Sequence, residues 1–360
     1  MRAILLTLLL FLITSSMVAA QSSSDNIQFY GDFKLVHIGF DTDASGLGGN
    51  DINGIRFRPG LRITFNDNHS FSGRMVLLKT IEKEDFEFTI APNAPNGGVG
   101  LAFGSLSFDE FYYQYKDEKQ TFRIGRFQES FKVLSNAGRS IDRFQSNAVF
   151  VHWTDGISYN RVIGNQWTAQ AVLEYQNRDH ISYPYSGRLD FGDNEHNMNM
   201  YLGLNNRGRD QFNLIQRDIG VFVAPNGYFG PDGYETYASI SSRAVMDLPE
   251  KDLLRGGSFR IAGELGQVVT TDFQDGTIAV ISAGINNFAD RHEFMVEFTT
   301  GDRDWLHASN YAPATDEMEI RYRIFLTGNF QMDTRYRVRV PHNENLPYQY
   351  STFIRATYTF

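Results

Sequence analysis

Apolar and polar residues alternate one by one along many stretches of the chain. From Ile55 to Phe65, the isoleucine, phenylalanine and leucine side chains fall on one face, and Arg56, Arg58 and Arg62 fall on the other. The stretch from Trp167 to Tyr175 alternates in the same way. A period of two residues is typical of a β-strand whose two faces meet different surroundings. The pattern therefore predicts an all-β protein.

Sixteen segments of the chain carry this pattern, and their connections alternate between short and long. Membrane-spanning strands of a barrel show about ten residues of such alternation, with short turns at one end and long loops at the other. A β-sandwich does not need this rhythm of connections. The sequence therefore predicts an up-and-down transmembrane antiparallel β-barrel of about 16 strands. The segments are Ile27–Phe40, Asn53–Phe65, Ser70–Ile81, Leu106–Lys116, Gln120–Gln128, Ala148–Ile163, Gln166–Asn177, His196–Asn205, Gln211–Ala224, Tyr234–Asp247, Ser258–Thr270, Gly276–Asn287, His292–Gly301, Glu317–Thr327, Gln331–Pro341 and Tyr350–Phe360.

The N-terminal end has the pattern of an export signal. Arg2 precedes an apolar run over Ala3–Ile13, and small residues at Val18–Ala20 form a cleavage site before Gln21. A membrane anchor is the alternative, but a spanning helix needs about 20 apolar residues. We expect a signal peptide over residues 1–20 and a mature barrel domain over residues 21–360, located in the bacterial outer membrane and in contact with its lipids.

The C-terminal end alternates up to the last residue, with apolar groups at Ile354, Ala356, Tyr358 and Phe360. The segment resembles the closing strand of bacterial outer-membrane barrels. The resemblance implies that the assembly machinery recognises this end, so that Tyr358 and Phe360 serve membrane assembly. In a water-soluble protein, the same pattern would describe a half-buried edge strand.

The charge of the chain excludes some function classes and favours another. The net charge is -9, with 33 Lys and Arg against 42 Asp and Glu, which argues against nucleic acid as a partner. There is no cysteine, so disulfides and thiolate metal centres are excluded. Of the 33 basic residues, 26 are arginine.

Ten of these arginines and one lysine gather at inward-facing positions of six predicted strands. Because the last strand of a closed barrel pairs with the first, these strands form one continuous surface, which we call the basic wall. The alternative is that these cations only fill a polar lumen and have no role in selectivity. A wall of cations in a pore favours anions, so we expect these residues to line the pore and set its selectivity. The basic wall comprises Lys34, Arg56, Arg58, Arg62, Arg74, Arg321, Arg323, Arg335, Arg337, Arg339 and Arg355.

The segment Phe122–Phe131, with its Gly-Arg-Phe and following Phe, resembles the strand-closing segment of the phosphate-selective porin O and P family. The opening stretch Phe29–Lys34 is also similar. The resemblance implies a sixteen-stranded diffusion porin, generally a homotrimer, in which a loop inserted after this strand enters the barrel. The third outer connection is the candidate constriction loop, with charged residues at Glu129, Arg139, Asp142 and Arg143.

Patterns that would indicate enzyme chemistry are missing. The sequence has no His-Glu-x-x-His, Gly-x-Ser-x-Gly or phosphate-binding Gly-x-x-x-x-Gly-Lys motif. The stretch Asp41–Gly46 imitates the first half of a calcium loop, but Ile52 occupies the place of the required glutamate. We therefore predict no catalytic residues, no metal site and no cofactor.

On these grounds the sequence predicts a porin for the passive diffusion of small, anionic, hydrophilic solutes. A lipase-type or protease-type barrel enzyme is one alternative, which an activity assay on lipid or peptide would distinguish. A non-conducting surface adhesin is the other, which single-channel current would distinguish.

Overall fold

The computed structural model describes residues 26–42, 50–81, 105–128, 154–164, 166–176, 197–230, 233–249, 257–270, 276–305 and 311–360. The predicted signal peptide over residues 1–20 lies outside these residues. Most of three long outer connections lies outside them as well. No helix in the described ranges is long and apolar enough to cross a membrane.

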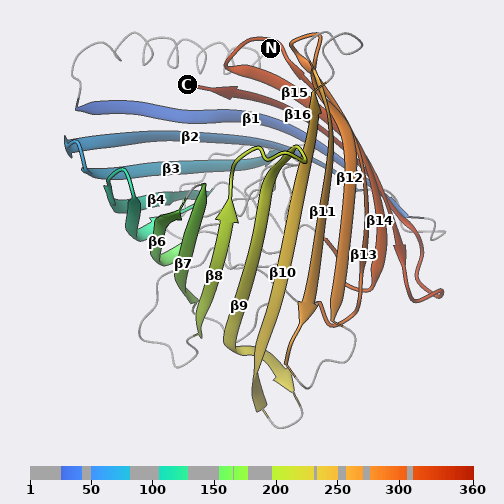
Figure 1. Cartoon of the computed structure of the whole chain (residues 1–360). Helices are drawn as coiled ribbons and strands as arrows, with labels where there is room; N and C mark the ends of the chain where they lie inside the picture. Colours follow the sequence, from blue (N-terminus) through green and yellow to red (C-terminus); the bar gives the residue numbers. More distant parts are fainter. Residues whose placement is uncertain are drawn as a thin grey trace.

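The described residues form sixteen strands that close into a barrel (Figure 1). Each strand pairs antiparallel with the next, and the last pairs with the first. The predicted all-β, up-and-down barrel is thus confirmed. The strands are β1 (Ile27–Thr42), β2 (Asn50–Asn66), β3 (His69–Ile81), β4 (Ser105–Lys116), β5 (Gln120–Phe127), β6 (Thr154–Gly164), β7 (Trp167–Gln176), β8 (Asn197–Asn206), β9 (Leu214–Gly230), β10 (Gly233–Pro249), β11 (Ser258–Val268), β12 (Thr277–Phe288), β13 (His292–Gly301), β14 (Thr315–Phe325), β15 (Phe330–Pro341) and β16 (Gln349–Thr359).

The two faces of the barrel wall differ in polarity. On β8, Met200, Leu202 and Leu204 are exposed on the outer face, whereas Asn199 and Tyr201 are buried on the inner face. In a water-soluble protein the apolar side chains face the buried interior, so the polarity of the two faces is reversed here. A closed barrel pairs every spanning strand on both edges, which hydrocarbon requires because it offers no hydrogen bonds to the backbone. The apolar outer face and the closed sheet together suit a lipid environment.

The short turns are stabilised by side chains that bond to the backbone. In the turn between β4 and β5, Asp117 accepts hydrogen bonds from the backbone N–H groups of Lys119 and Gln120 at 2.8 and 2.9 Å. These donors, together with the side chains of Gln120 and Tyr115, stabilise the carboxylate and lower the pKa of Asp117 to about 2. Local bonds of this kind favour a tight turn over a continuing strand.

The largest difference from the predicted strands is at β9. The sequence predicts an end at Ala224, because Pro225 and Gly227 follow, but β9 continues to Gly230. Pairing of β9 with β8 ends at Val223, so Pro225 costs no ladder bond to β8. Beyond that point β9 pairs only with β10, and the ribbon extends past the neighbouring strands (Figure 1).

The seam between β1 and β16 includes the last residue. The backbone N–H of Gly31 donates to the carbonyl of Phe360 at 2.8 Å, and the N–H of Phe360 donates back at 3.1 Å. The Phe360 ring stacks on Phe57, with a centroid distance of 6.1 Å. A Cβ at Gly31 would lie 2.7 Å from the Phe360 ring, so glycine leaves the space that this ring fills. Tyr358, predicted with Phe360 to serve assembly, stacks on the same ring.

Candidate functional site: the lumen of the barrel

All eleven cations of the basic wall lie on the inner face. Residues of the wall pair directly across strands, as Lys34 does with Arg56 and Arg321 with Arg335. Six of the arginines are buried. These six are Arg56, Arg58, Arg74, Arg321, Arg335 and Arg355. Cations this close together and this poorly hydrated require counter-charges.

Carboxylates from β1 and β4 supply the counter-charge for the first half of the wall. Asp32 bonds to Arg56 at 3.2 Å and also contacts Arg58. Asp109, which is completely buried, bonds to Arg58 at 3.1 Å and to Arg74 at 2.8 Å. Each acid therefore holds two arginines, and Arg58 links the two acids into one network.

Asp333 on β15 is the centre of the second half of the wall. Its carboxylate lies 2.7 Å from Arg355, 3.5 Å from Arg321 and 3.7 Å from Arg335. The Arg335 guanidinium lies 3.7 Å from the centre of the inward Phe353 ring, in cation–π contact. One buried carboxylate and one aromatic ring thus hold three arginines in place.

Further acids on β13 and β14 complete the network. Arg337 bonds to Glu319 at 2.7 Å and Arg339 bonds to Glu317 at 2.6 Å. Arg323 bonds to Glu293 at 2.8 Å. The sequence analysis did not single out these acids, although they share the inward parity of the arginines and could have been found by the same alternation.

The wall nevertheless keeps a positive excess. Its eleven cations meet eight inward carboxylates on the described strands β13 to β16 and β1 to β4, an excess of three positive charges. Two cations in particular make no carboxylate contact within the described residues. Arg62 donates to the Ser72 hydroxyl at 3.1 Å and lies over the Tyr30 ring, and Lys34 interacts with Asp32 at longer range than an ion pair. The eight carboxylates are Asp32, Asp109, Glu110, Glu293, Glu297, Glu317, Glu319 and Asp333.

The predicted constriction-loop residues Glu129, Arg139, Asp142 and Arg143 lie outside the described residues. The last described residue before them is Gln128. Its side-chain oxygen accepts bonds from Arg58 at 3.0 Å and from Arg74 at 2.8 Å. The chain that leaves β5 is therefore attached to the basic wall from inside the barrel.

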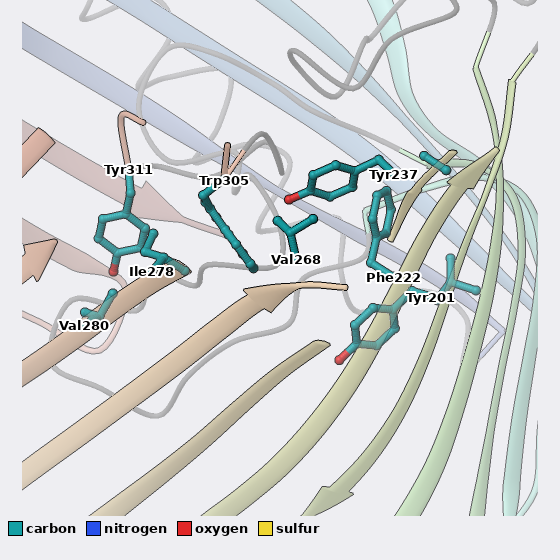
Figure 2. Close-up of a cluster of buried hydrophobic side chains, with 10 residues drawn as sticks. Tyr201, Phe222, Tyr237, Val268, Ile278, Val280, Trp305 and Tyr311 are labelled. Atoms are coloured by element: carbon teal, nitrogen blue, oxygen red, sulfur yellow. The ribbon is translucent and has the colours of Figure 1, made fainter. Parts of the chain in front are cut away.

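The opposite side of the lumen carries the ion-paired Arg243, Asp218 and Glu264 and, beside them, a group of apolar side chains that the sequence pattern did not predict. We call this group the Trp305 cluster. Its members come from β7 to β12 and from the connection between β13 and β14, and Figure 2 shows how they face one another. The Tyr, Phe and Val residues at inward positions of β8 to β12 could have been identified from the alternation of the sequence. The cluster comprises Val172, Tyr201, Phe222, Ala224, Tyr237, Val268, Ile278, Val280, Trp305 and Tyr311.

The described residues contain no group of three or more His, Cys, Asp or Glu that could hold a metal ion. One described histidine contacts a carboxylate: His342 lies 3.2 Å from Asp316, and both side chains are exposed. No hydroxyl group is recorded in hydrogen-bond contact with His342 within the described part of the chain.

Comparison with known proteins places the fold. No protein-family model and no curated protein matches the sequence. The chain matches the solved structure of OprB from Pseudomonas putida with a TM-score of 0.62 and 11% identity, over 96% of each chain. It matches OmpF from Salmonella typhi with a TM-score of 0.57 and 11% identity, over 93% of this chain and 98% of that one. An anion-selective porin from Comamonas acidovorans matches with a TM-score of 0.54 and 10% identity, over 93% and 99% of the two chains. The chain therefore has the fold of outer-membrane porins.

Proposed function

We propose that this chain is a bacterial outer-membrane porin, a water-filled channel for the passive diffusion of small hydrophilic solutes. The observation that carries the proposal is the charged inner face of a closed sixteen-strand barrel whose outer face is apolar. Barrels of this size leave an interior wider than side chains alone fill. In this proposal residues 1–20 are a cleaved export signal, and the barrel of residues 21–360 resides in the outer membrane.

We further propose that the channel prefers anions. The support is the excess of three positive charges along the basic wall, with Lys34 and Arg62 outside the ion pairs of the described structure. The carboxylates that hold the paired arginines in fixed positions also cancel much of the arginines' positive field. The two unpaired cations are therefore the main source of selectivity, and the net charge of -9 for the whole chain matters less. Ions respond to charges within about a Debye length, ~8 Å at physiological salt.

The test is the reversal potential of single channels in a potassium chloride gradient. Changing Lys34→Gln and Arg62→Gln together removes two charges without leaving a buried acid unpaired. A unit charge about 7 Å away in water contributes ~0.6 kcal/mol, so the chloride-to-potassium permeability ratio should fall by roughly two- to threefold after screening.

The matched control is the double change Arg337→Gln and Glu319→Gln, which removes one bonded pair and keeps the excess at three. Its permeability ratio should equal that of the wild type. A wild-type channel that prefers potassium would refute the anion preference. A wild type without current would refute the porin itself and favour the adhesin, while hydrolysis of lipid or peptide would favour the barrel enzyme.

The resemblance to the phosphate-selective family leads to a finer hypothesis, that phosphate occupies the wall. The eight carboxylates weigh against tight phosphate binding, because each repels the doubly charged anion. Adding phosphate to a chloride solution tests this hypothesis. Block of the chloride current at millimolar phosphate would support a phosphate preference, and an unchanged current would exclude it.

A homotrimer is the proposed assembly. The supporting feature is an ion pair on the outer face, where Arg126 bonds to Asp155 at 2.7 Å beside the exposed Phe108 and Phe111. A charged pair on an apolar face is better accommodated against another protein surface than against lipid. Chemical cross-linking in mild detergent should yield trimers, and a monomer alone would exclude this assembly.

A further inference from the structure

The connection between β13 and β14 turns back into the barrel at both of its described ends. Trp305 is only 2% exposed, and Tyr311 is 5% exposed. Both pack against inward side chains of β11 and β12, with the Trp305 ring next to Ile278 and Val268 (Figure 2). An outer connection of a porin would otherwise meet water, so burial of these two aromatic residues requires a reason.

We propose that Trp305 is a fixed selectivity element: it fills the lumen in front of β11 and β12 and confines permeating ions to a path along the basic wall. The inference deepens the proposed anion channel and rests on it. It assigns a role to a part of the chain that the candidate constriction loop does not include.

The Trp305 ring packs against a glycine of β11, and we call the space that this glycine leaves the seat of Trp305. A Cβ at Gly266, an inward position of β11, would lie 2.4 Å from one ring carbon of Trp305 and 2.9 Å from a methyl group of Ile278. Any larger residue at this position would displace the indole ring. The close approach of the indole ring to β11 therefore depends on Gly266.

Polar contacts fix the backbone on either side of the ring. Asp302 accepts a bond from the backbone N–H of Thr277 at 3.3 Å and also bonds to the Thr277 hydroxyl. The Tyr311 hydroxyl donates to Glu297 at 3.2 Å, and the Thr315 hydroxyl donates to the carbonyl of Ala312 at 2.7 Å. With both ends attached to barrel strands, Trp305 is held in one place.

The position of the cluster determines where ions travel. It covers some of the inner positions of β7 to β12, beside the ion-paired Arg243, Asp218 and Glu264, and the basic wall covers β14 to β16 and β1 to β3. Where the cluster lies, apolar side chains neither hydrate ions nor leave room for them, so the open path there lies towards the wall. Ions that stay within a Debye length of the wall experience its field. Filling one side of the lumen thus strengthens the selectivity created on the other.

Two variants test the inference. Trp305→Ala should raise single-channel conductance by roughly one and a half-fold or more and move the chloride-to-potassium permeability ratio towards one, because the widened path leaves the wall's field. Trp167→Ala is the control, since this tryptophan begins β7 on the outer face, and its conductance and permeability ratio should match the wild type.

Gly266→Ala tests whether the burial of Trp305 depends on this glycine. The measurement is tryptophan fluorescence, which needs no channel current. In a chain whose other tryptophans, Trp153 and Trp167, are changed to Phe, quenching of Trp305 fluorescence by acrylamide should increase several-fold. Gly263→Ala is the control on the same strand, because a Cβ there meets its nearest atom at an ordinary 3.8 Å.

The outcomes separate the two proposals. A silent wild-type channel would refute the porin. A conducting wild type whose conductance and permeability ratio are unchanged by Trp305→Ala would overturn the role of Trp305 alone. Equal quenching in the two glycine variants would also overturn it, even where Trp305→Ala fails to fold.

Discussion

The basic wall and the Trp305 cluster share one lumen but hold their side chains in place by different forces. In the wall, a few carboxylates such as Asp333 and Asp109 each fix two or three arginines by directional bonds. In the cluster, rings and aliphatic groups from β7 to β12 are held by burial, which has no preferred direction. Removing one acid should therefore disturb several arginines, whereas trimming one apolar group should act locally.

The two groups also differ in how far their stability depends on charged partners. Burying an indole side chain of about 200 Å² contributes about 5 kcal/mol, with no partner that must stay charged. A buried ion pair gains little over an apolar replacement, but breaking it leaves an uncompensated charge. The cluster is therefore intrinsically stable, and the stability of the wall depends on every acid in it.

The largest effect is expected for Asp333→Asn. Loss of this carboxylate leaves Arg321, Arg335 and Arg355 without their shared counter-charge, which should lower the free energy of unfolding by about 3–5 kcal/mol. The measurement is urea unfolding of the barrel in lipid vesicles. Asp316→Asn is the control, since this acid lies on the outer face with a side chain 58% exposed, and its stability should stay within about 0.5 kcal/mol. Equal stability of the two variants would contradict the central role of Asp333.

A smaller effect is expected for Ile278→Val in the Trp305 cluster. Ile278 is 1% exposed, and loss of one methyl group should lower the free energy of unfolding by about 0.5–1.5 kcal/mol. Ion selectivity should not change, because Trp305 keeps its place against Gly266 and no charge moves. Urea unfolding and the reversal potential measured on the same preparation check both statements. A changed permeability ratio would show that the cluster and the wall are coupled more tightly than we infer.

The smallest effect is expected from salt. Raising the concentration from about 0.1 M to 1 M shortens the Debye length from about 10 Å to about 3 Å, which should weaken anion preference but leave the packing of Trp305 unchanged. Reversal potentials at constant concentration ratio report the first quantity, and acrylamide quenching of Trp305 reports the second. Increased quenching at high salt would mean that charge, rather than burial, holds the ring.

The sequence predicts the strands and the inward placement of the wall's cations well, because both follow from the period of two residues. Arg335 and Arg337 fall on the inner face once β15 is recognised, and the acids Glu317 and Glu319 follow by the same rule on β14. Their pairing could have been inferred from parity, but the register that joins Glu319 to Arg337 required the structure.

The seat of Trp305 could not be predicted, and the end of β9 was predicted wrongly, each for a physical reason. The connection that carries Trp305 has no periodicity, and nothing local relates it to Gly266 on a different strand. At β9, Pro225 and Gly227 favour a turn. The pairing of β9 with β8 ends at Val223, however, so the missing N–H of Pro225 interrupts no hydrogen bond to β8. Local propensity fails where the pairing of neighbouring strands changes.

The seam between Gly31 and Phe360 sets an order of events in the life of the chain. The ribosome makes Gly31 long before Phe360, yet the backbone groups of Gly31 find these partners only at Phe360. Until then the edge of β1 has unpaired donors and acceptors that can join any other strand. The nascent chain must therefore be kept from aggregating until β16 has been made, and a chain that stops before Phe360 would leave this closing pair of bonds unmade.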